Sequence, residues 1–316
     1  MKKFLISIDT EGDDLWHKSA NDSVATENAK TLERFQNLCE EFGFKPTYLT
    51  NYEMGLDRKF QRWCKPKTSE KCEIGMHLHA WNTPPIVKLP SSPAKHGKPY
   101  AVEYDEETIT EKILTITNLL SDRFETSIIT HRVGRWTTNL KYLNVLRRCG
   151  YKVDCSYTPH INWNMPGYME GVWGSDYSQV SEQPFLLFED GSPMLEVPVT
   201  VRTRRGMSFP NQWSPRGIGY VLRRCFQPCS IWFRPNGRNF NEMRWLIDKI
   251  ADEKESDYLM FMLHSSELMP GGSPSFKTVG DVDDLYRQLY KLFSTVAKKF
   301  EGTTIGEYGL QKLTSL

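Results

Sequence analysis

Two histidines two residues apart are the feature of this sequence best suited to chemistry. They are His77 and His79, in the segment CEIGMHLHAWNTPP over residues 72–85, at the end of a run typical of a β-strand. Strand side chains alternate between faces, so both imidazoles point the same way, with Cβ atoms roughly 6 to 7 Å apart. This spacing suits one metal ion, although two unrelated histidines on a half-exposed strand fit it equally well.

Other polar residues also follow short apolar runs. Asp9 and Glu11 come after FLISI at residues 4–8, and His264 ends an apolar run at residues 258–264. Further polar residues placed in this way are Arg132, Arg135, Asp154 and Glu196. In an α/β barrel the carboxyl ends of the strands meet at one mouth, so these side chains are expected to converge.

The segments that must position these side chains alternate along the chain. Apolar runs of the length of a β-strand are followed by segments whose apolar residues recur at helical spacing. The expected strands are 4–8, 45–50, 73–79, 127–131, 151–156, 194–201, 231–234 and 258–264, and the expected helices are 24–42, 54–63, 105–120, 138–149, 241–251 and 282–300. About seven such units predict an α/β fold with a closed or nearly closed parallel barrel. No linker divides the chain, so residues 1–316 are predicted to form a single domain, with irregular insertions near 82–104 and 157–192.

Charge and hydropathy exclude several classes of protein. The chain has 40 Lys and Arg against 39 Asp and Glu, and this balance argues against a dedicated nucleic-acid or membrane-surface protein. No apolar run approaches the roughly 18 residues of a membrane span, and the apolar part of the start, MKKFLISIDTEGDD, is too short for a signal peptide. We therefore expect a cytoplasmic protein without stable membrane insertion. Its seven cysteines fit reduced thiols.

Four motifs occur in the order typical of one enzyme superfamily. They are SIDTEGD at the first strand, EIGMHLHAWNTPP, HRVGRW and MLHSSELMPG. In this order they resemble the polysaccharide deacetylase superfamily, the NodB-type carbohydrate esterases, over residues 3 to about 308. The HxHxW signature followed by NTPP is most similar to the branch found in surface-polysaccharide gene clusters, including those for O-antigen and capsule.

The resemblance implies a fold, a reaction and a set of roles. Members of the superfamily have a distorted (β/α)7-type barrel and remove N-acyl groups, usually N-acetyl, from sugars with a divalent metal, usually zinc. Carried onto this chain, Asp9 is the general base, Arg132 orients it and His264 is the general acid. Glu11, His77 and His79 are the metal ligands. Trp81, Trp136, Trp163 and Asp154 are the expected substrate-binding residues.

Some assignments stay open at this stage. The commoner motifs have adjacent aspartates and histidines four apart, so either Asp9 or Glu11 could be the ligand, and we favour Glu11. Asp154 either orients His264 or caps a loop, and each tryptophan suits a core position as well as a sugar platform. Glu267 fits a structural acid at a helix start, and His17, His96, His131 and His160 are interpreted as ordinary residues.

The leading hypothesis is a metal-dependent N-deacylase that acts on a sugar for a surface glycan. The substrate would be nucleotide-linked or lipid-linked, or an oligosaccharide. One alternative is a related amidohydrolase acting on another carbon–nitrogen bond, including a metal-free one as in allantoinase-like relatives. The other is a catalytically silent sugar-binding module, which would have lost acid, base or ligand residues.

Overall fold

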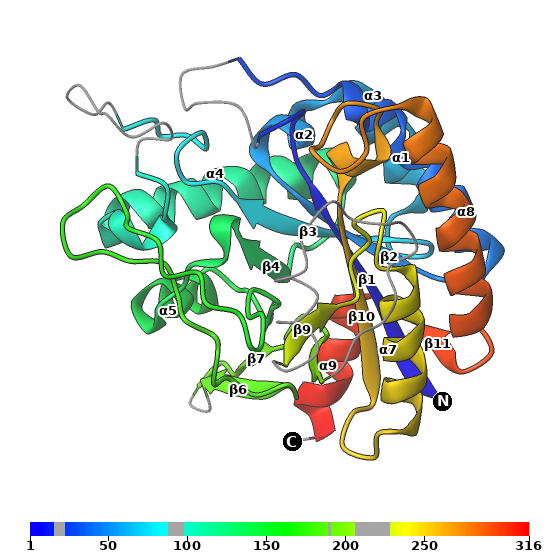
Figure 1. Ribbon diagram of the computed structural model, residues 1–316. Coiled ribbons are helices and arrows are strands. Elements are labelled where there is room, and N and C mark those ends of the chain that lie inside the picture. The colour runs from blue at the N-terminus through cyan, green and yellow to red at the C-terminus, as the bar shows by residue number, and fades with distance from the viewer. Residues whose placement is uncertain (16–22, 88–97, 189–190, 206–227, 316) are drawn as a thin grey trace.

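The computed structural model describes residues 1–15, 23–87, 98–188, 191–205 and 228–315. The strands in these ranges are β1 Lys2–Thr10, β2 Pro46–Thr50, β3 Glu73–Leu78, β4 Thr130–Val133, β5 Val153–Asp154, β6 Phe185–Phe188, β7 Met194–Glu196, β8 Val201–Arg204, β9 Cys229–Trp232, β10 Tyr258–His264 and β11 Phe300–Gly302. Nine form a curved sheet in the order β10-β1-β2-β3-β4-β5-β7-β6, with β11 beside β1 (Figure 1). Neighbours are parallel except β6 and β7, and β8 pairs only with β9 among the described strands.

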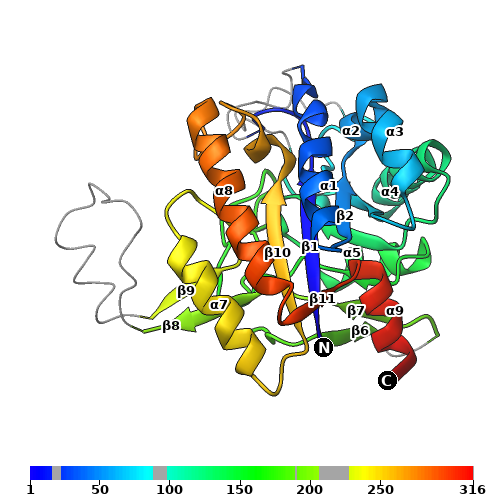
Figure 2. The same cartoon turned by 90° about the vertical axis from the view of Figure 1, so that its right-hand side faces the viewer.

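The helices lie mainly on the outer face of this sheet (Figures 1 and 2). They are α1 Leu32–Glu41, α2 Tyr52–Leu56, α3 Arg58–Cys64, α4 Glu106–Phe124, α5 Leu140–Arg148, α7 Phe240–Asp252, α8 Val279–Val296 and α9 Ile305–Ser315. The last helix, α9, covers the amino-terminal end of the strands, where Gly306 N donates to Glu73 and Ile305 N to Thr47. The carboxyl-terminal end therefore remains for the site.

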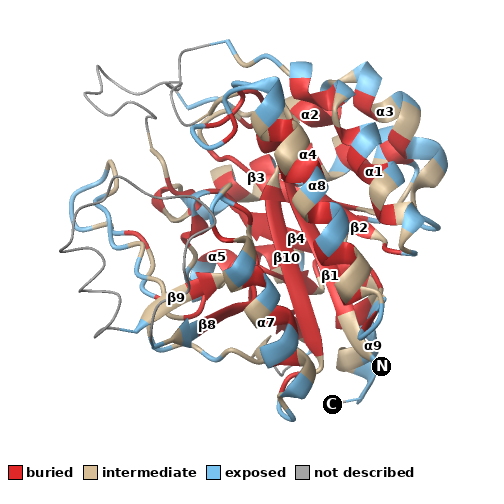
Figure 3. Ribbon diagram, turned by 45° about the vertical axis from the view of Figure 1, so that its right-hand side comes forward, coloured by how far each residue is buried: buried red, intermediate tan, exposed pale blue. Residues whose placement is uncertain are grey.

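Alternating side chains of β1 explain why the sheet is buried on both sides (Figure 3). Phe4 and Ile6 belong to the larger apolar cluster under the outer helices. Leu5 belongs to a second cluster inside the curve, together with Val153 and Met260. Such two-sided burial is the pattern of a barrel strand rather than of an exposed sheet.

The curve closes through irregular hydrogen bonds rather than a regular strand pair. Thr200 Oγ1 accepts from Met260 N at 2.8 Å, and Thr200 O accepts from Phe233 N at 3.3 Å. Phe233 O in turn accepts from Met262 N at 3.1 Å. These contacts connect the segment after β7 to β10, so the prediction of a distorted α/β barrel is confirmed.

Some predicted boundaries were wrong. The expected strand 194–201 divides into β7 and β8, because Pro198 between them has no N–H for a ladder. The expected helix 24–42 is a short 3-10 turn at Glu27–Lys30 followed by α1. His17, His96 and part of the 82–104 insertion lie outside the described residues.

In the described part of the chain, no helix is both long and apolar enough to cross a bilayer.

Candidate metal centre

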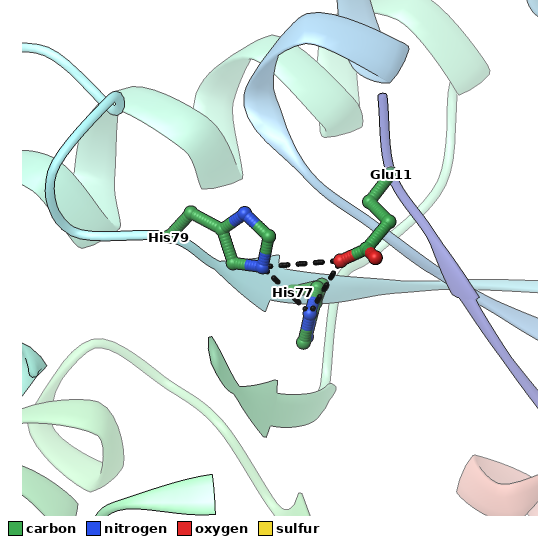
Figure 4. Close-up of side chains that lie close together, drawn as sticks. All are labelled: Glu11, His77 and His79. Carbon is green, nitrogen blue, oxygen red and sulfur yellow. Dashed lines mark hydrogen bonds and ion pairs between the residues drawn. The ribbon is translucent and has the colours of Figure 1, made fainter. Parts of the chain in front are cut away.

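Three buried ligand-type side chains converge at the carboxyl end of the sheet (Figure 4). Glu11 follows β1, His77 lies on β3 and His79 directly follows β3. Glu11 Oε2 is 3.5 Å from His77 Nε2 and 3.2 Å from His79 Nε2, and the two Nε2 atoms are 3.0 Å apart. The sequence expectation that the i, i+2 histidines share a face therefore holds in the geometry, and the acid beside them is Glu11.

These separations suit a tetrahedral metal ion. Ligand bonds of 2.0–2.1 Å in a tetrahedral site place neighbouring ligand atoms roughly 3.3 Å apart. The three observed distances, 3.0, 3.2 and 3.5 Å, bracket that value. His77 Nδ1 lies 3.0 Å from the carbonyl oxygen of Arg132, a contact that holds the ring with Nε2 toward the cluster. Glu11, His77 and His79 thus fit a zinc-type ion.

The charges in the cluster shift its pKa values. Burial raises the pKa of the Glu11 carboxyl, but His264 and hydrogen bonds from His77 and His79 outweigh burial and hold it well below its ordinary value. Burial and the charge of His77 lower the pKa of His79 to about 4. Metal-binding groups must be deprotonated, so a carboxylate and a neutral imidazole stand ready at neutral pH.

Asp9 lies beside the cluster but is bound to Arg132. Asp9 Oδ1 accepts from Arg132 Nη1 at 2.6 Å, while its other oxygen, Oδ2, is 4.0 Å from His77 Nε2 and 3.8 Å from His264 Nε2. Burial raises the pKa of Asp9, but the Arg132 guanidinium, His77 and His264 together lower it below its ordinary value. Asp9 is therefore an ionised carboxylate with one oxygen directed toward the cluster.

Arg132, which pairs with Asp9, is fixed in place by burial and by further hydrogen bonds. Its side chain is fully buried, Nε donates to Cys155 O at 2.9 Å, and Nη1 also donates to Ser7 Oγ at 3.0 Å. These partners come from β1 and the end of β5, so the guanidinium crosses the inside of the barrel. The position fits the expected role of orienting Asp9.

His264 faces the cluster from the end of β10, which pairs in register with β1 so that His264 lies opposite Asp9. Its Nδ1 is 3.3 Å from Glu267 Oε2 and 3.0 Å from Arg234 Nη2. Glu267 also accepts from His264 N at 2.9 Å and from Arg234 at 3.1 Å. Glu267 therefore orients His264. It is also the helix-start acid that the sequence predicted, because it caps the 3-10 turn Ser265–Leu268, but its contact with the His264 ring was not predicted. Its spacing of three residues after His264 was the available signal.

We expect Glu267→Gln to reduce stability at neutral pH much more than in acid. Burial raises the pKa of Glu267, but Arg234 and His264 lower it to about 2. An unfolded glutamate titrates near pH ~4.3, so the depressed pKa stabilises the fold above that pH by about 3 kcal/mol, and this stabilisation is lost as pH falls toward ~2. Urea unfolding at pH 7 and at pH 2.5 measures the difference, because most of the stabilisation is lost only close to the lowered pKa.

The control is Glu33→Gln, an exposed glutamate on α1, expected to change stability by less than ~0.5 kcal/mol at both pH values. A Glu267→Gln deficit that is equally large at both pH values would contradict the assigned charge interaction.

The cluster opens into a cavity of about 490 Å³, which the expected tryptophans line together with Arg135 and Tyr100. Trp81 stacks on His79 with ring centroids 4.3 Å apart and planes 20° apart. Trp136 and Trp163 stack on each other with centroids 5.9 Å apart and planes 8° apart. All three tryptophans line the cavity, and Trp136 is also buried in the inner apolar cluster, so it fits a core position as well as a sugar platform.

Asp154 does not face this cavity, contrary to its expected role in substrate binding. Its carboxylate is fully buried and lies 2.6 Å from His131 Nδ1, while Ser156 Oγ donates to it at 2.8 Å. The register of β4 and β5 places His131 opposite Asp154, and that of β5 and β7 places Glu196 beside it. Asp154 and Glu196 therefore belong to a buried structural network. His131 joins this network through its contacts with Asp154 and Tyr142, so its interpretation as an ordinary residue was wrong.

Gly134 allows the turn after β4 to contact His79. A Cβ at Gly134 would lie 2.5 Å from His79 Cδ2 and 2.8 Å from Leu78 O. We expect Gly134→Ala to destabilise the fold by about 1–3 kcal/mol through overpacking. Thermal unfolding measures this.

Gly280→Ala is the matched control, because its Cβ would meet nothing closer than Thr278 Oγ1 at 3.7 Å on a helical backbone. Equal stability of the two variants would contradict the close packing at Gly134.

Comparison with solved structures identifies the fold. The chain is similar to a protein assigned as a polysaccharide deacetylase from Mycobacterium smegmatis, with a TM-score of 0.58 and 12% identity over 100% of this chain and 92% of that chain. It is also similar to the Puue allantoinase, with a TM-score of 0.53 and 13% identity over 98% and 88%. A third similar structure is a 4-alpha-glucanotransferase from Thermococcus litoralis, with a TM-score of 0.54 and 11% identity over 98% of this chain and 40% of that chain.

Neither protein-family models nor curated protein sequences give a match. The three similar structures have names that indicate different reactions, so their likeness identifies the architecture, and the chemistry must be argued from the side chains. The order of strands, the curved parallel sheet and this likeness agree with the fold that the four motifs imply. The chain therefore has the fold of the polysaccharide deacetylases.

Proposed function

We propose that the protein is a metal-dependent hydrolase that removes an N-acyl group, taken here as N-acetyl, from a sugar. The observation that carries the proposal is the convergence of Glu11, His77 and His79 at ligand distances. The paired Asp9 and Arg132 lie directly beside them. A base next to a metal-ligand set is what hydrolysis of an unactivated amide requires.

Zinc is the proposed ion, because two imidazoles and one carboxylate are a typical catalytic zinc set. When bound, such an ion polarises the acyl carbonyl and lowers the pKa of the attacking water from 15.7 toward ~7. Three protein ligands leave the remaining coordination position for water or substrate.

Asp9 is the proposed general base. Its Oδ2 is directed toward the cluster and can accept the proton of the attacking water, while Oδ1 stays bound to Arg132. Arg132 keeps this carboxylate ionised although it is buried.

His264 is the proposed general acid. Its Nε2 faces Asp9 and Glu11 at 3.8 and 4.0 Å, and Glu267 holds the opposite edge of the ring. Protonated at Nε2, His264 can deliver a proton to the amide nitrogen as the carbon–nitrogen bond breaks. This step is needed because an amide anion is a very poor leaving group.

The alternatives fit the geometry less well. A metal-free amidohydrolase does not require two Nε2 atoms and a carboxylate oxygen within 3.0–3.5 Å of one another. A silent sugar-binding module does not require a base, an acid and ligands around one cavity. A role in surface-glycan synthesis rests on the motif resemblance. Cytoplasmic action on a nucleotide-linked, lipid-linked or oligosaccharide substrate is proposed on the sequence expectation alone.

The test is acetate release from a panel of N-acetylated sugars, measured together with the appearance of free amine. We expect equal amounts of both products, loss of turnover on chelation and recovery with added zinc. Turnover that resists chelation would favour a metal-free amidohydrolase, and sugar binding without acetate release would favour the binding module.

A further inference from the structure

Arg135 stands on the cavity wall next to the metal-ligand cluster. Its guanidinium carbon lies 5.1 Å from the ring centroid of Trp81, which in turn stacks on His79. A guanidinium stacked on an aromatic ring keeps its N–H edge available for hydrogen bonds. His79, Trp81 and Arg135 thus form a stack that leads from the metal ligands to an exposed cation.

The backbone that presents Arg135 is strained. Arg135 has φ 57° and Trp136 has φ 59°, a left-handed conformation that costs non-glycine residues about 1 kcal/mol or more each. Gly134 before them lets the turn press against His79, because any Cβ there would clash. An arginine that is only solvated at the surface does not require a left-handed backbone or a glycine before it. These features fix the direction in which the Arg135 guanidinium points, and we interpret that direction as functional.

Arg135 also differs from the neighbouring arginines in its charge partners. Arg132 is paired with Asp9, and Arg234 is paired with Glu267. Within the described ranges, no carboxylate lies within 4.0 Å of the Arg135 guanidinium, and the nearby Glu11 carboxylate faces the two histidines. Among the described residues, the cavity wall therefore carries an arginine that no carboxylate pairs with directly, and only Glu11 attracts its charge at longer range.

We infer that Arg135 binds an anionic group of the substrate, a phosphate or a carboxylate, so that the sugar acted on is anionic rather than neutral. The inference rests on the proposed function and narrows its substrate class. The planar guanidinium can donate two parallel hydrogen bonds to such a group, and Trp81 fixes its plane. Because Arg135 and the cluster share one cavity of about 490 Å³, one substrate can reach both.

The test is isothermal titration calorimetry with the full chain and four probes. The neutral probe is methyl N-acetylglucosaminide, and the anionic probes are N-acetylglucosamine 1-phosphate, UDP-N-acetylglucosamine and N-acetylmuramic acid. We expect at least one anionic probe to bind about tenfold or more tightly than the neutral one, and Arg135→Gln to remove most of that ratio. Arg34→Gln is the matched control, because Arg34 is an exposed arginine 3.8 Å from the Tyr286 ring but outside the cavity.

The ratio separates the outcomes. Any contact between a probe and a bound metal is the same in the wild type and in Arg135→Gln. A change in the ratio of anionic to neutral affinity therefore reports the contribution of Arg135 itself. Tighter binding of the two phosphate probes, or of N-acetylmuramic acid, shows whether the anionic group of the substrate is a phosphate or a carboxylate. The inference would be overturned if every anionic probe bound no more tightly than the neutral probe, or did not bind detectably. It would also be overturned if Arg135→Gln weakened the binding of all four probes equally. Failure of deacylation contradicts the proposed function without altering these affinities.

Discussion

Asp9→Asn is expected to lower kcat by about 10²- to 10⁴-fold, the usual contribution of a positioned general base. Asparagine keeps the shape and can still accept a hydrogen bond from Arg132, but it cannot take a proton from water. We therefore expect metal content to stay at the wild-type level, because Glu11 and the two histidines remain. Steady-state kinetics and elemental analysis of the same preparation measure both quantities.

A matched control for this variant is Asp105→Asn. Asp105 is the N-cap of α4, where its side chain accepts from Thr108 N, and asparagine is an equally good cap. It should leave kcat unchanged. An Asp9→Asn variant that keeps its metal and more than a tenth of wild-type kcat would show that another group acts as the base.

Arg132→Met is expected to cost about 3–5 kcal/mol of unfolding free energy, the usual result of breaking a buried ion pair by removing one partner. Asp9 would be left as a buried carboxylate without its counter-charge, and Cys155 O would lose its donor. The Asp9→Asn, Arg132→Met double variant should be more stable than Arg132→Met alone, because no charge is then stranded. Urea denaturation of all four proteins measures this coupling.

Arg148→Met is the control for the loss of an arginine. Arg148 pairs with Glu106 on the surface, with about half of each side chain exposed. It should cost less than ~1 kcal/mol. Equal losses in Arg132→Met and Arg148→Met, or a double variant less stable than Arg132→Met, would contradict the buried pair.

The convergence of the proposed metal ligands and the proposed base could be predicted from the sequence because it depends on local rules, whereas their roles came from the motif resemblance. Strand alternation puts His77 and His79 on one face, and the carboxyl end of a buried strand delivers Asp9 and Glu11 to the barrel mouth. Parallel strands then bring these short motifs together whatever lies between them. The preference for Glu11 over Asp9 as the ligand agrees with the observed distances.

The residues that support the site depend on register and could not be predicted in this way. His131 meets Asp154 because β4 and β5 pair as they do, and a shift of one residue would point Asp154 to the other face. Glu267 returns to His264 through a 3-10 turn, so its spacing of three residues after His264 was a signal, but no strand or helix periodicity indicated the contact. The stack of Trp81 and Arg135 likewise joins segments more than fifty residues apart.

The most direct measurement is the metal content of the protein purified without chelator, compared with the His77→Ala, His79→Ala double variant. We expect about one divalent ion per chain in the wild type and almost none in the double variant. His160→Ala is the matched control, because His160 pairs with Glu182 outside the cluster, and it should keep the ion. No bound metal in the wild type even after addition of zinc, or equal metal in the double variant, would contradict the metal centre.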